Sequence, residues 1–320
     1  MLIKDRVYGN IEVTESVLLE LINSKPVQRL RGIYNSPIVY SVSPWKDFTR
    51  YEHSLGAMLC LRIKGASVEE QIAGLLHDVP HTAFSHAVDF VFNDEKHAFH
   101  ERFHEKIIKN SFIPKILEKH GFGVERVLDD KNFTLLEKDL PDLCADRIDY
   151  TLREFVCRDK NFDEVQEYIK HIVIHNKVFV FDEKTIAKKF SEKFLEMIQN
   201  WGGPEDLATQ QIIVETLKIG LKENIIVQED LFTTDQEVID KLKASHNKEI
   251  EELFGLLSTD LKVINDPADF NYYAKEKNRF IDPLVLPENK KVSDIYPDYM
   301  EMLTKHKEFM NKGIYAKIIK

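Results

Sequence analysis

The sequence has few of the features that mark secreted, membrane-spanning or disulfide-stapled proteins. It contains only 3 cysteines in 320 residues, and this small odd number predicts reduced thiols rather than a disulfide framework. No stretch approaches the ~20 apolar residues that a membrane-spanning helix needs. The first residues, MLIKDRVYGN, lack the apolar run of a secretory signal. We therefore expect a cytoplasmic protein.

An excess of positive charge is also missing. The formal net charge of −10 at pH 7 argues against a broad nucleic-acid-binding face, but it leaves room for a small cationic pocket around one anionic ligand. An apolar content of 43% with 31% charged residues is ordinary for a globular protein. The length suits one large domain, or a domain with an appendage.

Helical periodicity dominates the first half of the chain. Apolar spacing predicts helices at about 51–64, 68–78, 84–92 and 97–110, and a strongly amphipathic helix within 140–157. A short hairpin is expected over 2–13, with its turn at Gly9–Asn10. Pro80 should end the second of these helices, because it restricts the preceding residue to extended geometry and has no N–H to donate.

The pattern changes after about residue 160. The segments HIVIH and VFVF, on either side of Asn176–Lys177, predict a second hairpin. Charged helices are expected at about 184–199, 205–221, 234–256 and 298–311, with a β-like NIIVQ between two of them. We predict a mainly α protein in two parts. Residues 1–160 form a helical bundle with small β hairpins, and residues 161–320 form a helical C-terminal region with a β hairpin that packs on this core.

Histidine is concentrated in one part of the chain. Seven of the 12 histidines lie between residues 53 and 104: His53, His77, His81, His86, His97, His100 and His104. Imidazole together with carboxylate suits a hard or borderline divalent metal. The segment therefore predicts a metal site, and ligands of this mixed kind leave Mn, Fe, Mg, Ni and Zn open.

The adjacent pair His77–Asp78 is the centre of this pattern. Neighbouring side chains on a regular helix point ~100° apart, so the pair can serve one metal only where the helix ends, as Pro80 makes it do. His53 and Asp146 would complete a set of two imidazoles and two carboxylates. Such a set leaves positions for water and for a phosphate oxygen, and a bound metal lowers the pKa of that water.

Groups suited to phosphate binding and proton transfer accompany these ligands. Arg50 shares a helix face with His53, and its guanidinium can bind two phosphate oxygens at once. His86 and Asp89 are three residues apart, and a carboxylate that orients an imidazole raises its basicity. His81 and His100 can join this relay. Packing, capping or ion pairing is the alternative role for each of these residues.

The motifs resemble those of the HD-domain phosphohydrolases, most closely the deoxynucleoside triphosphate triphosphohydrolases. The resemblance rests on RYEH (50–53), HDVPHTAFSHAVD (77–89), FHE (99–101) and DRIDY (146–150). It implies an HD-domain helical bundle and a metal-dependent phosphohydrolase acting on a nucleotide or other phosphorylated small molecule. Hydrolysis of a dNTP to deoxynucleoside and triphosphate is the leading reaction. The family often assembles, which leaves a homo-oligomer open.

The resemblance also implies roles by position. The implied metal ligands are His53, His77, Asp78 and Asp146. Phosphate contact or proton transfer is implied for Arg50, His81, His86, Asp89 and His100. The implied substrate contacts are Gln28 at the sugar, Arg147 in place of a phosphate-binding Lys, and Tyr150 against the deoxyribose. His97 and His104 fit surface positions, and Cys144 fits a buried thiol.

Departures from the family pattern keep other functions open. The family's sugar-binding Asp aligns with Glu154, and EKFLEMIQNWGGPEDLATQQ has neither the Arg nor the Tyr that the family uses there. One alternative is an HD hydrolase of another phosphoester, such as a nucleotidase or an enzyme for cyclic nucleotides or guanosine tetraphosphate. A second is a metal-retaining nucleotide-sensing module without turnover. A third is a di-iron oxygenase, which would need His81 or another group as an extra ligand.

Overall fold

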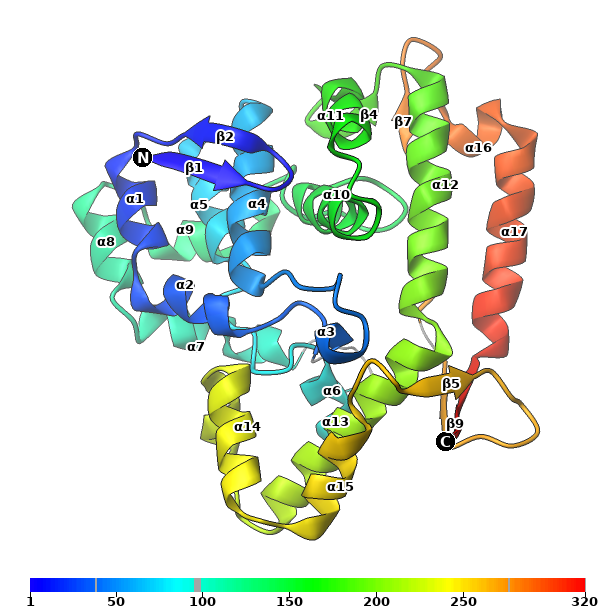
Figure 1. Cartoon of the computed structure of the whole chain (residues 1–320). Coiled ribbons are helices and arrows are strands. Elements are labelled where there is room, and N and C mark those ends of the chain that lie inside the picture. The colour runs from blue at the N-terminus through cyan, green and yellow to red at the C-terminus, as the bar shows by residue number, and fades with distance from the viewer. Residues whose placement is uncertain (38, 95–98, 276, 320) are drawn as a thin grey trace.

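The computed structural model describes residues 1–37, 39–94, 99–275 and 277–319 and is mainly helical, as predicted (Figure 1). His97 lies outside the described residues. The first half contains β1 (Leu2–Asp5), β2 (Gly9–Glu12), α1 (Ser16–Ile22), α2 (Lys25–Arg29), α3 (Val39–Val42), α4 (Arg50–Ile63), α5 (Val68–Leu76), α6 (Ala87–Val91), α7 (His104–Lys109), α8 (Ile113–Lys119), α9 (Val124–Leu128) and α10 (Ala145–Asp159).

The second half combines long helices with two small sheets. Its helices are α11 (Phe162–His171), α12 (Lys184–Trp201), α13 (Pro204–Lys222), α14 (Asp235–Ala244), α15 (Lys248–Leu256), α16 (Val292–Ile295) and α17 (Pro297–Lys312). Its strands are β3 (Ile172–His175), β4 (Val178–Phe181), β5 (Lys262–Ile264), β6 (Tyr272–Ala274), β7 (Leu284–Val285), β8 (Lys290–Lys291) and β9 (Ile314–Ile319), which form sheets in the orders β3-β4-β7-β8 and β5-β9-β6. None of the described helices combines the length and apolar character needed to cross a bilayer.

Both predicted hairpins are present, but the first turns earlier than the sequence suggested. Asp5 of β1 pairs with Gly9 of β2, so the turn is at residues 6–8 and not at Gly9–Asn10. The Asp5 carboxylate accepts the backbone N–H groups of Val7 and Tyr8 at 2.7 and 3.0 Å, a local bond that competes with the Gly-Asn signal. The second hairpin turns at Asn176–Lys177 as predicted.

Left-handed residues explain three further differences from the predicted elements. The segment predicted as one helix over 234–256 is divided into α14 and α15 at His246, whose φ is 51°. The helix expected at 84–92 begins only at Ala87, because Phe84 and Ser85 have φ values of 61° and 48°. NIIVQ is not a strand: it begins at the left-handed Asn224, and its last residue starts the 3-10 turn η4 (Gln228–Phe232).

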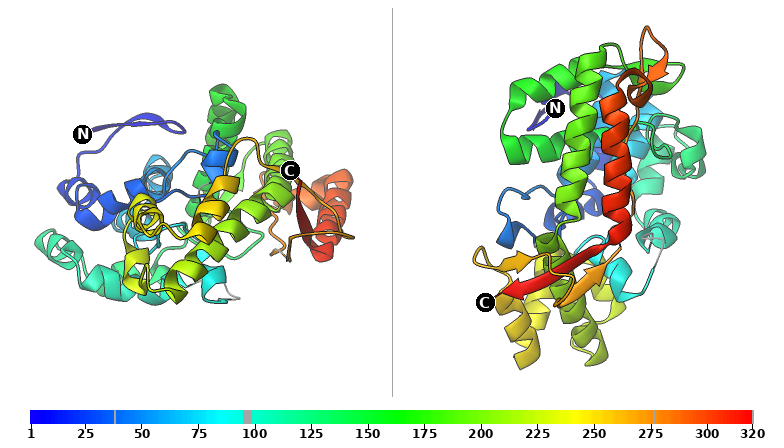
Figure 2. Two further views of the ribbon diagram at one scale, coloured as in Figure 1. Left: turned by 60° about the horizontal axis from the view of Figure 1, so that its bottom comes forward. Right: turned by 90° about the vertical axis from the view of Figure 1, so that its right-hand side faces the viewer.

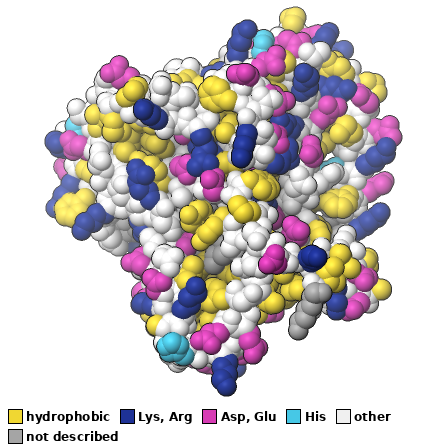
Figure 3. All heavy atoms as spheres, in the orientation of Figure 1, with side chains coloured by type: hydrophobic (Ala, Val, Ile, Leu, Met, Phe, Trp, Pro, Cys, Tyr) yellow, Lys and Arg dark blue, Asp and Glu magenta, His cyan; other side chains and the backbone are white. Residues whose placement is uncertain are grey.

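Two packing arrangements position the cavity described below. In the first half, α4 packs against both α5 and α10. In the second half, α12 lies beside α17, while α13, α14 and α15 form a lobe below them (Figures 1 and 2). This lobe packs on α6 through a second hydrophobic cluster that includes Phe84, Val88, Leu217 and Leu231. Acidic and basic side chains are interspersed on the face shown in Figure 3.

The largest hydrophobic cluster crosses the predicted boundary near residue 160. Phe155 of α10, Tyr168 of α11 and Phe181 of β4 surround Phe190 of α12, with ring centroids 5.2–5.8 Å from that of Phe190. The division into 1–160 and 161–320 stays a prediction, and this shared cluster joins its two parts.

We expect Phe190→Ala to lower the free energy of unfolding by about 3–5 kcal/mol, because it removes a fully buried ring from the shared cluster. Urea denaturation followed by circular dichroism and by tryptophan fluorescence should give one coincident transition. Phe112→Ala, at an exposed ring, is the control and should change the free energy by less than about 0.5 kcal/mol. Two separate transitions would show that the halves do not share a core.

Candidate metal centre and active site

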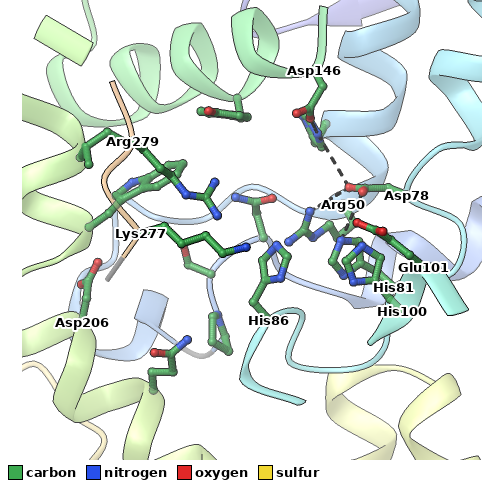
Figure 4. Close-up of a pocket in the computed structure, with 18 of the residues that line it drawn as sticks. Arg50, Asp78, His81, His86, His100, Glu101, Asp146, Asp206, Lys277 and Arg279 are labelled. Carbon is green, nitrogen blue, oxygen red and sulfur yellow. Dashed lines mark hydrogen bonds and ion pairs between the residues drawn. The ribbon is translucent and has the colours of Figure 1, made fainter. Parts of the chain in front are cut away.

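A cavity of about 470 Å³ lies between the first half and the helices and tail of the second. Its walls come from α4, the α5–α6 loop, α10, the α12–α13 junction and residues 277–279 (Figure 4). The predicted site residues that line it are Arg50, His53, His77, Asp78, His81, His86, His100, Asp146 and Tyr150. Segments far apart in the chain thus converge on one space.

The implied metal ligands meet at one end of the cavity. His53 Nε2 lies 2.8 Å from Asp146 Oδ1 and 3.3 Å from His77 Nε2, and His77 Nε2 lies 3.5 Å from the same Asp146 oxygen. Asp78 adds carboxylate oxygens 3.5 Å from His77 Nε2 and 3.8 Å from His53 Nε2. The donor atoms of His53, His77 and Asp146 are close enough together to hold one ion.

The opposite nitrogen of each imidazole is occupied, which orients both rings. Nδ1 of His53 donates to the Asp149 carboxylate at 2.8 Å, and Nδ1 of His77 donates to the carbonyl of Gly74 at 2.7 Å. A carboxylate and a carbonyl only accept, so each Nδ1 carries a proton, and a metal ion would bind at Nε2 in place of the proton that the neighbouring carboxylates favour there. The donor set and its orientation therefore fit a divalent ion.

Charge at this end of the cavity favours a cation. Burial opposes protonation of His77, yet the Asp78 and Asp146 carboxylates raise its pKa to about 10. Burial also opposes ionisation of Asp78, but Arg50 and neighbouring imidazoles hold the pKa of Asp78 well below its usual value. Arg50 Nη1 donates to Asp78 at 2.9 Å, and its Nε donates to the Ser85 hydroxyl at 3.0 Å.

The predicted relay forms a second group beside these ligands. His86 Nδ1 lies 2.9 Å from Asp89 Oδ2, and the other Asp89 oxygen accepts the N–H of Phe99 at 3.1 Å. The His81 and His100 rings are stacked with centroids 3.8 Å apart. Desolvation lowers the pKa of His86, partly opposed by Asp89, and lowers that of His100 to about 3.

Two predicted substrate contacts do not reach the cavity lining. The Gln28 amide donates to the Ile22 carbonyl at 2.6 Å and accepts from Arg31 at 2.8 Å, so it ties together the ends of the first two helices. The Arg147 guanidinium donates to the carbonyls of Lys138 and Asp142 at 3.2 and 2.6 Å and holds the segment before α10. Neither side chain is carried into the proposed site.

Other residues line the cavity although the sequence did not single them out. Lys277 and Arg279 enter from the opposite wall and point toward Arg50 and His86 (Figure 4). Trp201 packs its ring 5.4 Å from that of Tyr150. The remaining ones include Glu101, His104, Asp130, Glu137, Asp206 and Gln210. His104 was expected at the surface but lines the cavity. Its spacing of four residues from His100 could have indicated this, because residues four apart share a helix face.

We expect Asp149→Asn to weaken divalent metal binding by about 10- to 100-fold, because the amide no longer fixes His53 through a charged acceptor. Metal affinity is measured by competition with a chelator. Asp159→Asn, on the same helix but paired with Arg158 and Lys193, should bind metal as the wild type does. Equal affinity in both variants would contradict the orienting role.

The sequence of this chain is similar to that of known HD-domain proteins. A model of the HD domain matches residues 50–154. The uncharacterized protein YdhJ of Bacillus subtilis is 40% identical over 325 aligned residues, which cover 100% of both chains. The metal-dependent phosphohydrolase cns2 of Cordyceps militaris is 30% identical over 304 residues, covering 91% of this chain and 86% of that protein.

More distant matches agree with these. The deoxynucleoside triphosphate triphosphohydrolase SAMHD1 of Homo sapiens is 32% identical over 142 residues, which cover 37% of this chain and 22% of that protein. A phosphohydrolase structure from Bacteroides thetaiotaomicron has the same fold, with a TM-score of 0.68 at 17% identity over 92% of this chain and 94% of that one. The chain belongs to the HD-domain family and is a metal-dependent phosphohydrolase.

Proposed function

We propose that the enzyme hydrolyses a phosphoester of a nucleotide, with the conversion of a dNTP to deoxynucleoside and triphosphate as the leading reaction. One observation carries this proposal: the cavity joins a cluster of metal ligands, three cationic side chains and two aromatic rings. The cations are Arg50, Lys277 and Arg279, and the rings are Tyr150 and Trp201. The partial similarity to SAMHD1 supports the choice of a dNTP.

The phosphate-binding end uses groups whose positions are restrained. An ion held by His53, His77, Asp78 and Asp146 would lower the pKa of an attacking water and polarise the phosphorus. Mn, Fe, Mg, Ni and Zn are the candidate ions. Arg50 is held by Asp78 and Ser85, so its guanidinium can bind a phosphate oxygen with little loss of side-chain freedom. Lys277 and Arg279 approach from the other wall and suit the further phosphates of a triphosphate.

His86 is placed to deliver a proton to the leaving oxygen. Its Nδ1 is engaged by Asp89, which leaves Nε2 to face the substrate. Desolvation lowers the pKa of His86 and makes its imidazolium a stronger acid, while Asp89 keeps that form accessible. Proton transfer from Nε2 to the ester oxygen lets the nucleoside depart as an alcohol. His100 and His81 pack against each other beside this imidazole.

The aromatic end suits a nucleoside. Tyr150 and Trp201 present adjacent rings, and Ile198 and Leu207 extend this apolar wall. Bases and sugars pack well on such surfaces, while Asp206 and Gln210 offer polar groups to their edges. Tyr150 is thus proposed as a substrate contact, as the sequence suggested.

Hydrolysis of a nucleoside monophosphate is the second candidate. It is favoured by the positions of Gln28 and Arg147, which lie outside the cavity lining and so provide no sugar or triphosphate contact. Arg50 alone can neutralise much of the negative charge of a single phosphate group that lies beside the proposed metal ligands. The two candidates differ in their products, because one releases triphosphate and the other inorganic phosphate.

The assay is a panel of dNTPs, NTPs, nucleoside monophosphates, cyclic nucleotides and guanosine tetraphosphate with each of the candidate divalent ions. We expect metal-dependent release of deoxynucleoside and triphosphate. His77→Ala should lose both bound metal and activity, whereas His120→Ala, at a histidine that contacts Glu20 away from the cavity, should keep both. Retained activity in His77→Ala would rule out the proposed metal centre, and nucleotide binding without turnover would support a sensing module instead.

The pH dependence of kcat/KM tests the proposed acid. Asp89 favours the protonated form of His86, so Asp89→Asn lowers the pKa of His86 further. An acid must be protonated to act, and the alkaline limb of the profile should therefore move to lower pH. His86→Ala should remove that limb. If the alkaline limb of the Asp89→Asn profile stays at the wild-type pH, that limb reports the titration of a group other than His86.

A further inference from the structure

A carboxylate from the second half of the chain holds two segments of the cavity wall in the first half. Asp235 begins α14 and is 2% exposed. Its Oδ1 accepts the backbone N–H of Phe84 at 2.7 Å, and its Oδ2 accepts the backbone N–H of Tyr34 at 3.0 Å. Both carboxylate oxygens of this buried side chain are therefore used to join segments that lie far apart in the sequence.

The segment that Asp235 holds has an unfavourable backbone conformation. Phe84 and Ser85 are consecutive residues in the left-handed region, with φ values of 61° and 48°, and neither is glycine. Such residues persist only where their surroundings determine them, and they gather at functional sites. The hydrogen bond to the N–H of Phe84 is made at the first of these two residues.

The strained segment is connected directly to the phosphate-binding arginine. The Ser85 hydroxyl accepts from Arg50 Nε at 3.0 Å and donates to the carbonyl of Tyr34 at 2.6 Å. Arg50 in turn donates to Asp78. Asp235 binds the N–H of Phe84, which precedes Ser85 in the chain, and the N–H of Tyr34, whose carbonyl accepts from the Ser85 hydroxyl. It therefore restrains both the backbone and the hydrogen-bond partner of the serine that contacts Arg50.

Neighbouring contacts from the same lobe reinforce this arrangement. The carbonyl of Leu231 accepts the N–H of Ala83 at 2.7 Å. Arg29 donates to the carbonyl of Thr233 at 3.0 Å and to those of Val79 and His81 at 2.6 and 2.8 Å. Residues 231–235 therefore act as a template against which the loop from Val79 to His86 is folded.

We propose that Asp235 is a positioning residue for phosphoester hydrolysis, which sets the Phe84–Ser85 segment so that Arg50 and His86 face the reacting phosphate. The proposal rests on the phosphate chemistry of the proposed function and is independent of which nucleotide is the substrate. Asp235 acts through the backbone and touches neither substrate nor metal. The α13–α15 lobe thereby has a part in catalysis although it contributes no metal ligand.

The test uses Asp235→Asn in the full chain. The amide has the same size but only one acceptor, so one of the two N–H groups would face an NH₂ donor. Asp282→Asn is the matched control, because Asp282 is also buried, accepts the N–H and hydroxyl of Ser293 at 2.9 and 2.6 Å, and does not line the cavity. Melting temperature, metal content and steady-state kinetics are measured for both.

We expect Asp235→Asn to lower kcat by at least about tenfold with its metal content unchanged, and Asp282→Asn to stay within about twofold at a similar melting temperature. Phenyl phosphate and 4-nitrophenyl phosphate provide a second readout. The phenyl ester depends more on protonation of its leaving oxygen, so its kcat should fall at least about threefold further when His86 is displaced. A purely structural role would lower both esters equally.

Three results with the Asp235→Asn variant overturn the proposal. They are unchanged kcat in folded Asp235→Asn, loss of activity in proportion to lost metal, and equal losses for the two esters. If Asp235→Asn does not fold, Ser85→Ala must show the reduced kcat, and wild-type activity there also overturns the proposal.

Cleavage of aryl esters without cleavage of any nucleotide would reject the proposed substrate while leaving the Asp235 comparison intact. If aryl esters are not cleaved, the comparison uses the nucleotide that is hydrolysed fastest.

Discussion

The close approach of α4 and α10 at Gly56 is the constraint on which the proposed metal centre depends. A Cβ atom at Gly56 would lie 2.0 Å from Asp149 Oδ1 and 2.1 Å from Arg153 Nη2, so a larger residue there would displace this ion pair. His53, three residues earlier on the same face of α4, can then reach both Asp146 and Asp149 of α10. A larger residue at 56 would therefore disturb the carboxylate that orients His53, whereas His77 and Asp78 come from the end of α5.

Buried charge is stable at this contact because every carboxylate has a partner. Asp149 is fully buried and accepts from Arg153 through both of its oxygens, at 2.9 and 3.1 Å, while it also orients His53. Asp5 of the first hairpin adds a second carboxylate to Arg153 at 3.1 Å. Isolated charges would be costly here, whereas a paired network fixes one arrangement of the groups around it. The first hairpin thus helps to hold the helix that carries Asp146.

The site residues that could be predicted are those encoded within short motifs. RYEH, HDVPHTAFSH and DRIDY each place their side chains by local helix geometry, and their ligand residues all line the cavity. Asp235 and Arg279 could not be found this way, because Asp235 lies 151 residues from Phe84 and a charged tail residue looks like an ordinary surface group. Gln28 and Arg147 show the converse: a matching position in the chain does not determine which way a side chain points. The predicted helices differed mainly where left-handed residues interrupt them.

The proposed metal ligands and most of the facing cavity wall come from different elements, although Tyr150 lies on the same helix as Asp146. The proposed metal ligands lie on α4, at the end of α5 and on α10, and α4 packs against both of the other helices. The facing wall comes from the end of α12, the first turns of α13 and residues 277–279, and it includes none of the proposed ligands. We expect substitutions in that wall to change the choice of substrate more than the metal affinity, because none of its residues is a proposed ligand. The segment at Phe84–Ser85 is the exception, since it is folded against the α13–α15 lobe and also holds Arg50. We therefore expect a change in that lobe to affect the proposed phosphate site through Asp235, and a change at Trp201 or Arg279 to act mainly on substrate binding.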